Sequence, residues 1–585
     1  MTAAAHRQRS GTFPSTPTAW IPRNVILRRS IRAALLSLCA FAAAGTALAD
    51  EPRPALMAEC LVPADAESEE WPGQHAWQAL EANGYTLGEL AVEVRDVYVG
   101  TALPWYARLA NALHINTQPP VIHSLLTVES GSPVEASRIY EAERVLRDLA
   151  FLTDARIVPT RCTEGRVDAE VRVRDAWTLR VGGGFGSAGG QTTSSFDFYE
   201  DNFIGTGKAV RLGWRRGRDR TTRELGYRDP AVLGSPWTVD LAHETSTDGY
   251  SNAAALAYPF RRADQGSAVR IEGGNQRRDL SFEQGGDEAY SARAVAEHAA
   301  VEYRQLVARD GPVGWRTGVG FRRDFRSYGE LEVEDADLRP PPELIDRRLQ
   351  GPYLVLERFR DSFRSFRNLR RFSATEDYRI GLNARLVGGR YADRGTNASP
   401  WFTELALSHG TEVGANNLLL AGLDVSGRYR PEGEWETLLA GIEMDYYHRT
   451  SPRNTIVTHV EFDWRDDRDP EDELYLGGGD GLLGYPARFR VGDRRWLTHI
   501  EDRYTTDIIL FDTIQIGYTA FLEAGAIRGL DGDWSRTLAS AGAGLRLGSL
   551  RSSFGSVTYL SVAMPLVDVG DQESYEVVIG STVNF

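Results

Sequence analysis

The sequence predicts a mainly β protein: a transmembrane antiparallel β-barrel preceded by one small α+β domain. Residues 574–585 alternate between mostly apolar or aromatic and mostly small or polar side chains, which is typical of a strand with one face in lipid. The chain has 58 glycines and 10% aromatic residues, and short alternating segments follow one another from Trp177 onward. After residue 49 no apolar run is long enough for a helical span, whereas a barrel strand needs only about 10 alternating residues. The apolar positions of the closing strand are Tyr575, Val577, Ile579, Val583 and Phe585.

The composition limits the partners and the compartment. The 585 residues suffice for more than one domain, and a net charge of −15 argues against a nucleic-acid partner, which favours a basic surface. Residues 1–49 are predicted to be a signal peptide, because arginines precede an uncharged run and an A-x-A site places cleavage between Ala49 and Asp50. Cys60 and Cys162 remain after cleavage, and an oxidising periplasm permits a disulfide between them, although two cysteines so far apart do not establish it.

The mature chain divides into three parts by pattern. Residues 50–86 are acidic and rich in proline and alanine, which predicts a flexible leader. Residues 87–175 predict a compact unit of order β-α-α-β-β, and residues 176–585 predict the barrel. The predicted elements of the compact unit are a strand at 90–99, a helix at 104–114, a helix beginning after Ser137, and strands at 155–160 and 167–173.

This compact unit resembles a POTRA domain. The element order, the stretch Ser130–Val134 before the second helix and the stretch Glu143–Arg147 within it carry the resemblance. Such domains form the periplasmic arm of outer-membrane barrels of the BamA/TamA superfamily, the bacterial surface antigen family. One copy is evident in this sequence. The resemblance implies a bacterial outer-membrane location, with the N-terminal domain in the periplasm and with insertion by the barrel assembly machinery.

A glycine-rich stretch between two predicted strands resembles the sixth extracellular loop of the same superfamily. There an R-G-[FY] tripeptide folds into the lumen, and its arginine pairs with lumen carboxylates. Gly484 and Tyr485 match the glycine and aromatic positions, but Leu483 stands where the arginine is expected. Either the loop still inserts, or the loss of the arginine leaves the loop more mobile or the protein no longer performs the task of that superfamily. In the inserted form Tyr485 anchors the loop by stacking, and Arg488 or Arg490 reaches Glu501 or Asp502. The motif is Gly481, Leu482, Leu483, Gly484, Tyr485 and Pro486.

Five predicted strands follow this loop, as the resemblance implies. The resemblance implies a barrel of about 16 strands, and the count of segments reaches about 20.

No cofactor is predicted. Gly184–Gly189 matches G-x-G-x-x-G, but the following residues lack the helix that a dinucleotide site requires, so we interpret it as a hairpin tip. The histidines of the mature chain lack metal-ligand spacing.

The resemblance implies a function in inserting or translocating polypeptides, and no enzymatic activity is predicted. The expected partners are outer-membrane lipid and unfolded outer-membrane or secreted proteins. The mechanism would be β-augmentation, in which the POTRA-like sheet captures an extended client polypeptide. Crosslinking of clients to residues 167–173 is expected to detect this capture. A seam between the first and last barrel strands would then admit the client. The alternatives are a passive pore or lipid or solute conduit, and a barrel enzyme such as a phospholipase.

Overall fold

The computed structural model describes residues 73–582, apart from short gaps at 101, 164, 189–190, 218–219, 286, 395–398, 415, 432, 434, 467–468, 479–480, 552–556 and 571–573. The predicted signal cleavage site, Cys60, Val583 and Phe585 lie outside the described residues.

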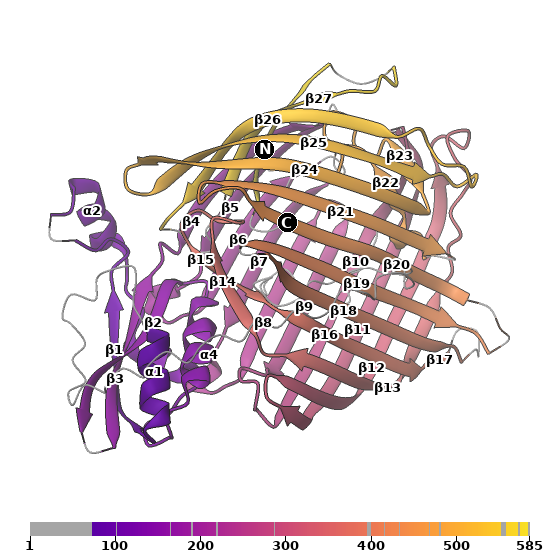
Figure 1. Ribbon diagram of the computed structural model, residues 1–585. Helices are drawn as coiled ribbons and strands as arrows, with labels where there is room; N and C mark the ends of the chain where they lie inside the picture. The colour runs from indigo at the N-terminus through magenta and orange to yellow at the C-terminus, as the bar shows by residue number, and fades with distance from the viewer. Residues whose placement is uncertain are drawn as a thin grey trace.

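A small mixed α/β domain comes first in the described chain (Figure 1). Its three-stranded sheet has the order β1-β3-β2, with β1 parallel and β2 antiparallel to the central strand β3. Buried side chains on one face of α4, among them Ile139, Ala142 and Leu146, pack against this sheet. The elements are α1 (Gly73–Ala82), β1 (Thr86–Arg95), α2 (Trp105–Leu113), α3 (Pro119–Leu125), α4 (Ala136–Arg147), β2 (Leu152–Thr163) and β3 (Arg166–Asp175).

The domain begins before the predicted boundary at residue 87. Residues 73–82, which the composition assigned to a flexible leader, form helix α1. Trp77 of this helix is 0% exposed in the domain core, and its indole Nε1 donates a hydrogen bond to the Ile157 carbonyl at 3.0 Å. The leader prediction was wrong here because the acidic, alanine-rich composition hid one large apolar side chain that the sheet buries. The C-terminal part of the predicted leader is therefore structural.

A closed antiparallel barrel follows the domain (Figure 1). Among the described residues the barrel sheet contains 21 strand segments. Two of them, β16 and β17, run along the same edge of β13 and form one interrupted strand. The described wall therefore has 20 strands. This agrees with the count of segments in the sequence and exceeds the number that the resemblance implied. The segments are β4 (Leu179–Ala188), β5 (Gln191–Glu200), β6 (Ala209–Arg216), β7 (Thr221–Asp229), β8 (Thr238–Ser246), β9 (Gly249–Tyr258), β10 (Ser267–Gln284), β11 (Asp287–Asp310), β12 (Val313–Val333), β13 (Arg347–Arg360), β16 (Gly381–Arg390), β17 (Ala392–Asp393), β18 (Trp401–Val413), β19 (Asn417–Tyr429), β20 (Trp435–Arg449), β21 (Asn454–Asp466), β24 (Arg494–Leu510), β25 (Ile514–Arg528), β26 (Leu538–Ser549), β27 (Val557–Pro565) and β28 (Glu576–Thr582).

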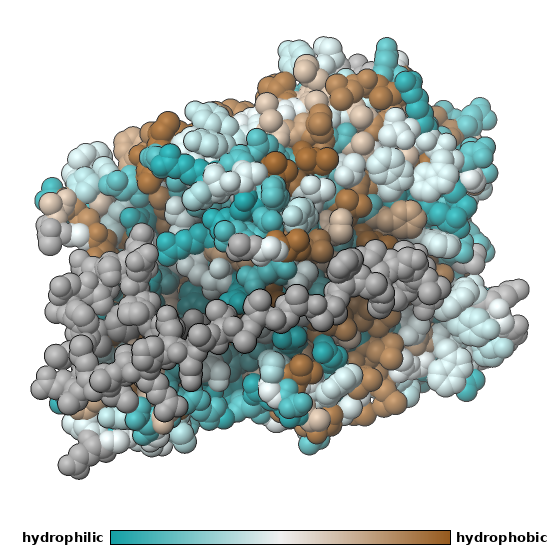
Figure 2. Space-filling model, viewed as in Figure 1, coloured by the Kyte–Doolittle hydropathy of each residue, from teal (hydrophilic) through white to brown (hydrophobic). Residues whose placement is uncertain are grey.

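The barrel wall has an apolar outside and a charged inside. In β24, Ile500 and Tyr504 are 44% and 41% exposed, whereas the intervening Glu501 and Arg503 are buried. Figure 2 shows apolar side chains over the strands at the top of the same view, where β24 to β27 lie. Because alternate side chains of a strand point to opposite faces, this pattern separates a lumen from an outer surface. None of the helices in the described part of the chain is long and apolar enough to cross a membrane.

The wall is short on one side and tall on the other. The first and last barrel strands, β4 and β28, are neighbours and close the barrel; we call their junction the seam. Among the described residues β28 is the shortest strand of the wall, with seven residues, whereas β11 on the opposite side has 24 residues. The N-terminal domain lies at one end of the barrel, which we call the domain end; the opposite one is the far end (Figure 1).

Candidate functional site

The loop with the predicted motif enters the barrel from the far end. This lumen loop, residues 467–493, connects β21 to β24 and contains η3 (Pro470–Asp472), β22 (Leu474–Leu476) and β23 (Arg490–Gly492). Leu476, Leu482 and Tyr485 are fully buried in one apolar cluster. The cluster is completed by wall residues from β24, β25 and the start of β26, namely Leu497, Ile527 and Leu538. The apolar side chains of the motif therefore hold the loop against the inside of the wall.

The motif residues make specific hydrogen bonds to the wall. The Tyr485 hydroxyl donates to the Ala539 carbonyl at 2.7 Å and accepts from the Val567 amide at 3.3 Å. The Gly484 amide donates to Glu576 at 2.7 Å and the Leu483 amide donates to Glu523 at 2.9 Å. Gly484 has φ +84°, and a Cβ there would lie 3.1 Å from the Pro565 nitrogen, so both the backbone conformation and the close approach require glycine.

The predicted ionic partners of the loop were wrong. Arg488 pairs with Glu283 of β10, on the other side of the lumen, and the Arg490 guanidinium lies 5.1 Å from the Phe489 ring centre. Glu501 instead accepts hydrogen bonds from Arg503 at 2.7 Å and from the Thr519 hydroxyl at 2.5 Å. Asp502 lies on the outer face of β24 and accepts a hydrogen bond from the side-chain Nδ2 of Asn454. Neighbouring residues of a strand point to opposite faces, so Glu501 and Asp502 were never equivalent candidates.

At the position of the missing arginine, two carboxylates bind the backbone of the loop. The side chains of Glu523 on β25 and Glu576 on β28 are both mostly buried. Each accepts a motif amide, as described above, and Glu523 also accepts from the Ser540 hydroxyl at 3.0 Å. The inserted position of the loop therefore does not depend on an arginine side chain at residue 483.

A substitution tests whether the side chain at 483 can reach these carboxylates. A Leu483→Arg change adds a charge-assisted hydrogen bond, which contributes about 1.5–3 kcal/mol when it forms. We expect the temperature at which the folded barrel unfolds to rise, as measured by loss of the compact form on gel electrophoresis. Leu483→Met, which keeps the size without the charge, should leave this temperature unchanged. Equal behaviour of the two variants would mean that the arginine does not reach Glu523 or Glu576.

A buried ion cluster anchors the beginning of the lumen loop. Asp469 accepts hydrogen bonds from Arg428 at 2.8 Å, from Arg347 at 3.0 Å and from Arg326 at 3.3 Å. These arginines come from β19, β13 and β12, and Glu436 of β20 pairs with two of them, Arg347 and Arg428. The Asp469 side chain is 3% exposed. Sequence reasoning missed this cluster, because an aspartate within the charged run 465–473 carries no local signal of burial.

A second segment fills the lumen at the domain end. Between β13 and β16 the chain forms the hairpin β14 (Phe363–Arg367) and β15 (Thr375–Arg379), which we call the mouth hairpin. Leu369 at its turn is 0% exposed and packs with Leu418 and Tyr447 of β19 and β20. Phe372 is 3% exposed and lies against the glycine backbone of β25 and β26. The hairpin therefore crosses from one wall of the lumen to the other.

Hydrogen bonds fix the turn of the mouth hairpin. Glu376 accepts the Leu369 amide at 3.0 Å and the Arg370 amide at 3.1 Å, which folds the turn onto β15. Arg370 donates to the Tyr447 hydroxyl at 2.6 Å, and Arg503 of β24 donates to the Leu369 carbonyl at 3.0 Å. This hairpin was not predicted from the sequence, because nothing local distinguishes a strand that crosses the lumen from one in the wall.

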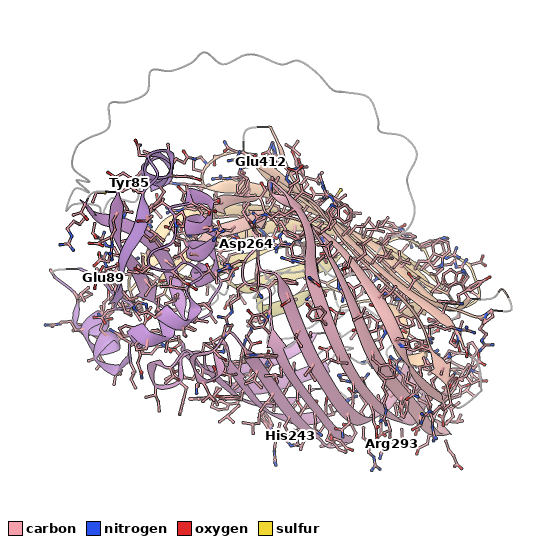
Figure 3. All side chains as sticks on the ribbon, turned by 90° about the horizontal axis from the view of Figure 1, so that it is seen from below. Tyr85, Glu89, His243, Asp264, Arg293 and Glu412 are labelled. Carbon is pink, nitrogen blue, oxygen red and sulfur yellow. The ribbon has the colours of Figure 1, made fainter. Side chains whose placement is uncertain are left out.

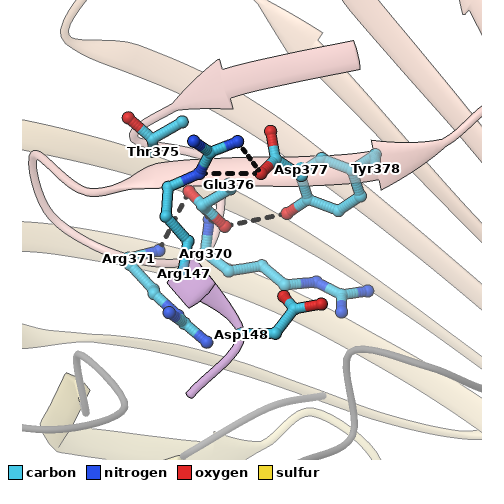
Figure 4. Close-up of a pocket in the computed structure, with 8 residues that line it drawn as sticks. All are labelled: Arg147, Asp148, Arg370, Arg371, Thr375, Glu376, Asp377 and Tyr378. Carbon is cyan, nitrogen blue, oxygen red and sulfur yellow. Dashed lines mark hydrogen bonds and ion pairs between the residues drawn. The ribbon is translucent and has the colours of Figure 1, made fainter. Parts of the chain in front are cut away.

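The N-terminal domain contacts the mouth hairpin directly. Arg147, the last residue of α4, donates to one carboxylate oxygen of Asp377 in β15 at 2.9 and 3.1 Å (Figure 4). Burial raises the pKa of the neighbouring Glu143 to about 7. The Arg147 guanidinium lies 3.7 Å from the Glu143 carboxylate and 2.9 Å from that of Asp377. The Arg144 guanidinium lies 4.0 Å from the centre of the Phe363 ring. Arg144 and Arg147, the two arginines of the last turn of α4, therefore both bind the hairpin.

A third contact of α4 reaches the barrel wall itself. Arg138 pairs at 3.0 Å with Asp264, in the turn between β9 and β10; Figure 3 shows Asp264 between the domain and the barrel. On the seam side, the Trp177 amide donates to the Arg551 carbonyl at 2.6 Å just before β4 begins. The domain is thus docked both at the lumen mouth and beside the seam.

Two predicted features of the domain and the first hairpin have defined positions. Cys162 lies in β2 and is disulfide-bonded. Its predicted partner Cys60 lies outside the described residues, so their pairing stays a prediction. Gly184 and Gly186 of the G-x-G-x-x-G match lie within β4, whereas Gly189 lies outside the described residues.

One cluster of three side chains in the described part of the lumen has possible metal-ligand atoms close to one another. Carboxylate oxygens of Glu443 and Asp445 and a ring nitrogen of His459 lie within 4.8 Å of one another. However, Asp445 already bonds His459 at 2.8 Å and Arg370 at 3.1 Å. The Arg370 guanidinium supplies the charge that a cation would bring, so we assign Asp445 to the anchoring of the mouth hairpin.

The fold and the filled lumen define a class: a closed antiparallel barrel with one mixed α/β domain at one end, which resembles outer-membrane barrels. No family model and no curated protein matches the sequence. Among solved structures, the chain is similar to BamA from Haemophilus ducreyi lacking POTRA domains 1–3, with 14% identity over 84% of each chain and a TM-score of 0.37. It is also similar to CdiB from Acinetobacter baumannii, with 11% identity over 85% of this chain and 73% of that chain and a TM-score of 0.37. CdiB from Escherichia coli gives 12% identity, 89% and 93% coverage and a TM-score of 0.35.

Proposed function

We propose that this protein is an outer-membrane barrel that binds extended polypeptides at its periplasmic domain and passes them to the membrane through the seam. One observation carries the proposal. The central strand β3 leads directly into β4, the first strand of the seam, and β1 lies parallel to β3 at the open edge of the domain sheet. A peptide paired with the outer edge of β1 would therefore be aligned along the path that leads to the seam.

The capture site differs from the one that the sequence suggested. Residues 167–173 belong to β3, which pairs with β1 on one side and β2 on the other, so its backbone groups are already used. The edge of β2 is partly covered, because Glu143 accepts the Ile157 amide at 2.8 Å and Arg147 donates to the Ala155 carbonyl at 3.2 Å. The start of β1 is also covered, because Leu87 exchanges backbone hydrogen bonds with Gly131 and Ser132 at 2.8 Å. β-Augmentation requires unpaired backbone groups, which leaves the outer edge of β1 from Leu90 to Arg95 as the proposed site.

The seam is the part of the wall that opens at the lowest cost. The described part of β28 contributes seven residues to the ladder, and β4 carries three consecutive glycines at 182–184. Glycine gives a strand no side chain to pack and weakens its pairing. The lumen, by contrast, is occupied by the lumen loop and the mouth hairpin, which favours a lateral route over a passive pore.

Site-specific photo-crosslinking tests this function. A photoreactive residue at Ala91, exposed on β1, and another at Val577, exposed on β28, should both crosslink an unfolded outer-membrane protein during its insertion. The same residue at Leu354, which is 67% exposed on the tall wall of β13, is the matched control and should give no client adduct.

Crosslinks at Leu354 as strong as those at Val577 would contradict a role for the seam. Steady single-channel conductance of the unmodified protein, with no client adduct at Ala91, would indicate a passive pore instead. Hydrolysis of phospholipid by the purified protein would indicate the barrel-enzyme alternative.

A further inference from the structure

One face of helix α2 is apolar and exposed, although the helix belongs to a folded domain. Trp105, Leu109 and Leu113 follow one another at intervals of four residues and so share one face of the helix. Their exposed fractions are 70%, 51% and 68%, and that of Ile115 just beyond the helix is 55%. We call these four residues the α2 apolar face.

The opposite side of α2 is anchored, so the direction of the apolar face is fixed. Ala107 is 0% exposed. The Asn111 side chain donates to the Tyr98 carbonyl at 2.8 Å and accepts the Tyr98 amide at 3.1 Å. His114, which follows the helix, lies with Nε2 3.0 Å from the fully buried carboxylate of Asp175. A buried polar network of this kind holds the helix in one orientation, with its apolar face turned away from the domain.

The helix is attached to the apolar tip of a barrel hairpin. Tyr106 of α2 has its ring 5.8 Å from that of Phe511, in the turn between β24 and β25, and donates to Asp512 at 3.0 Å. Phe511 is 69% exposed, and the preceding Leu510 is 43% exposed. Figure 1 shows α2 beside this end of the hairpin. On β25 the apolar series continues outward along the wall through Ile514, Tyr518 and Leu522.

A second barrel turn borders the α2 apolar face on its other side. The Gln118 amide donates to the Gly205 carbonyl at 2.8 Å, which places the segment after α2 against the turn between β5 and β6. Phe203 and Ile204 in this turn are 47% and 55% exposed. The strands between the two hairpins that carry these turns are β26, β27, β28 and β4, so the two turns lie on either side of the seam.

We propose that the α2 apolar face is embedded in the surface of the same lipid bilayer that surrounds the barrel, and that it fixes the domain at the foot of the seam. This inference rests on the proposed function, in which the barrel spans a membrane. Its basis is continuity: the α2 apolar face adjoins the exposed apolar tip of β24 and β25, whose outer surface faces lipid in that proposal.

The chemistry of the face suits a bilayer interface. Tryptophan and tyrosine have an apolar ring and a polar edge, and they concentrate where acyl chains meet headgroups. The exposed Arg108 borders the face and can extend its charged end toward the headgroups. The backbone of a helix is already hydrogen-bonded internally, so this face offers apolar contact alone, which lipid satisfies without a complementary shape.

Spin-label accessibility in the full-length protein tests the inference. Three variants, Leu109→Cys, Leu354→Cys and Glu129→Cys, are labelled and reconstituted into vesicles of phosphatidylcholine and phosphatidylglycerol in equal parts. Leu354 on the outer wall is the lipid control, and Glu129, exposed on the domain, is the water control. The unsubstituted protein measures background labelling. We expect the label at 109 to collide preferentially with oxygen, as at 354, and the label at 129 to collide preferentially with a water-soluble nickel chelate.

The controls separate failure of this inference from failure of the proposed function. A water-exposed label at 109 together with a lipid-exposed label at 354 would overturn the α2 inference alone. A water-exposed label at 354 would overturn the membrane barrel itself. Protection of the label at 109 only after addition of an unfolded client polypeptide would assign the face to client binding and would also overturn the inference.

Discussion

Replacing Asp469 with alanine is expected to lower the stability of the barrel by about 3 kcal/mol, because removing one partner from a buried ion pair leaves uncompensated charge. Here three arginines, Arg326, Arg347 and Arg428, share the single carboxylate of a side chain that is 3% exposed. Arg347 and Arg428 keep Glu436 as a second partner, which holds the loss near the lower end of the usual range. Urea unfolding of the barrel in lipid measures the change.

The same substitution should release the beginning of the lumen loop. Asp469 connects that loop to β12, β13 and β19, so its loss should increase proteolytic cleavage within residues 467–493. Asp337→Ala is the matched control, because Asp337 is an exposed aspartate in the neighbouring loop between β12 and β13. Unchanged stability and cleavage in the Asp469 variant would contradict an anchoring role for the ion cluster.

Replacing the mouth hairpin, residues 363–379, with a short glycine-serine turn is expected to raise the ion conductance of the barrel in planar bilayers. The hairpin occupies the domain end of the lumen through Leu369 and Phe372, whereas the lumen loop occupies the far end. Two obstructions in series each limit the current. We therefore expect a modest increase from the hairpin replacement alone, and an increase larger than the sum of the single effects when Asp469→Ala is added.

A variant that keeps the hairpin isolates the contribution of the domain. Arg147→Gln removes the ion pair with Asp377 and leaves the hairpin sequence intact. If the domain holds the hairpin in place, this variant should show brief openings, whereas Arg161→Gln, an exposed arginine elsewhere in the domain, should not. Conductance of the hairpin-replaced barrel equal to that of the unmodified barrel, with and without Asp469→Ala, would mean that the hairpin does not obstruct the lumen.

The mouth hairpin also explains how a small domain could influence a large barrel. Arg144 and Arg147 of α4 bind it from outside the lumen, while Arg503 and Arg546 of the wall donate to carbonyls of its turn from within. Arg370 of the turn in return binds Tyr447 of β20. Movement of the domain away from the barrel would break the first set of contacts and leave the second. A client polypeptide bound at β1 would therefore act on the same domain whose helix α4 contacts the mouth hairpin.

Much of the architecture was predictable because strand alternation is a local property. A strand that faces two environments needs only an alternation of side chains, which the sequence shows at its end. In the structure Tyr575 and Val577 are exposed, whereas Glu576 and Val578 between and after them are buried. The same rule, applied segment by segment, led to the count of about 20 strands. The inserted loop could be found from its glycine-rich motif, because Gly484 allows a close approach of the backbone to the wall and Tyr485 supplies a ring that is buried there.

The partners across the lumen were decided by the tertiary structure alone. Asp469 and Arg326 are 143 residues apart in sequence, and which arginines meet this carboxylate depends on how the strands are staggered when the barrel closes. The same closure determines that Glu523 and Glu576 bind the backbone at Leu483, and that Arg488 reaches Glu283. The sequence by itself determined which side chains face inward. Only the closed wall, in which each register depends on those of its neighbours, decided which of them meet.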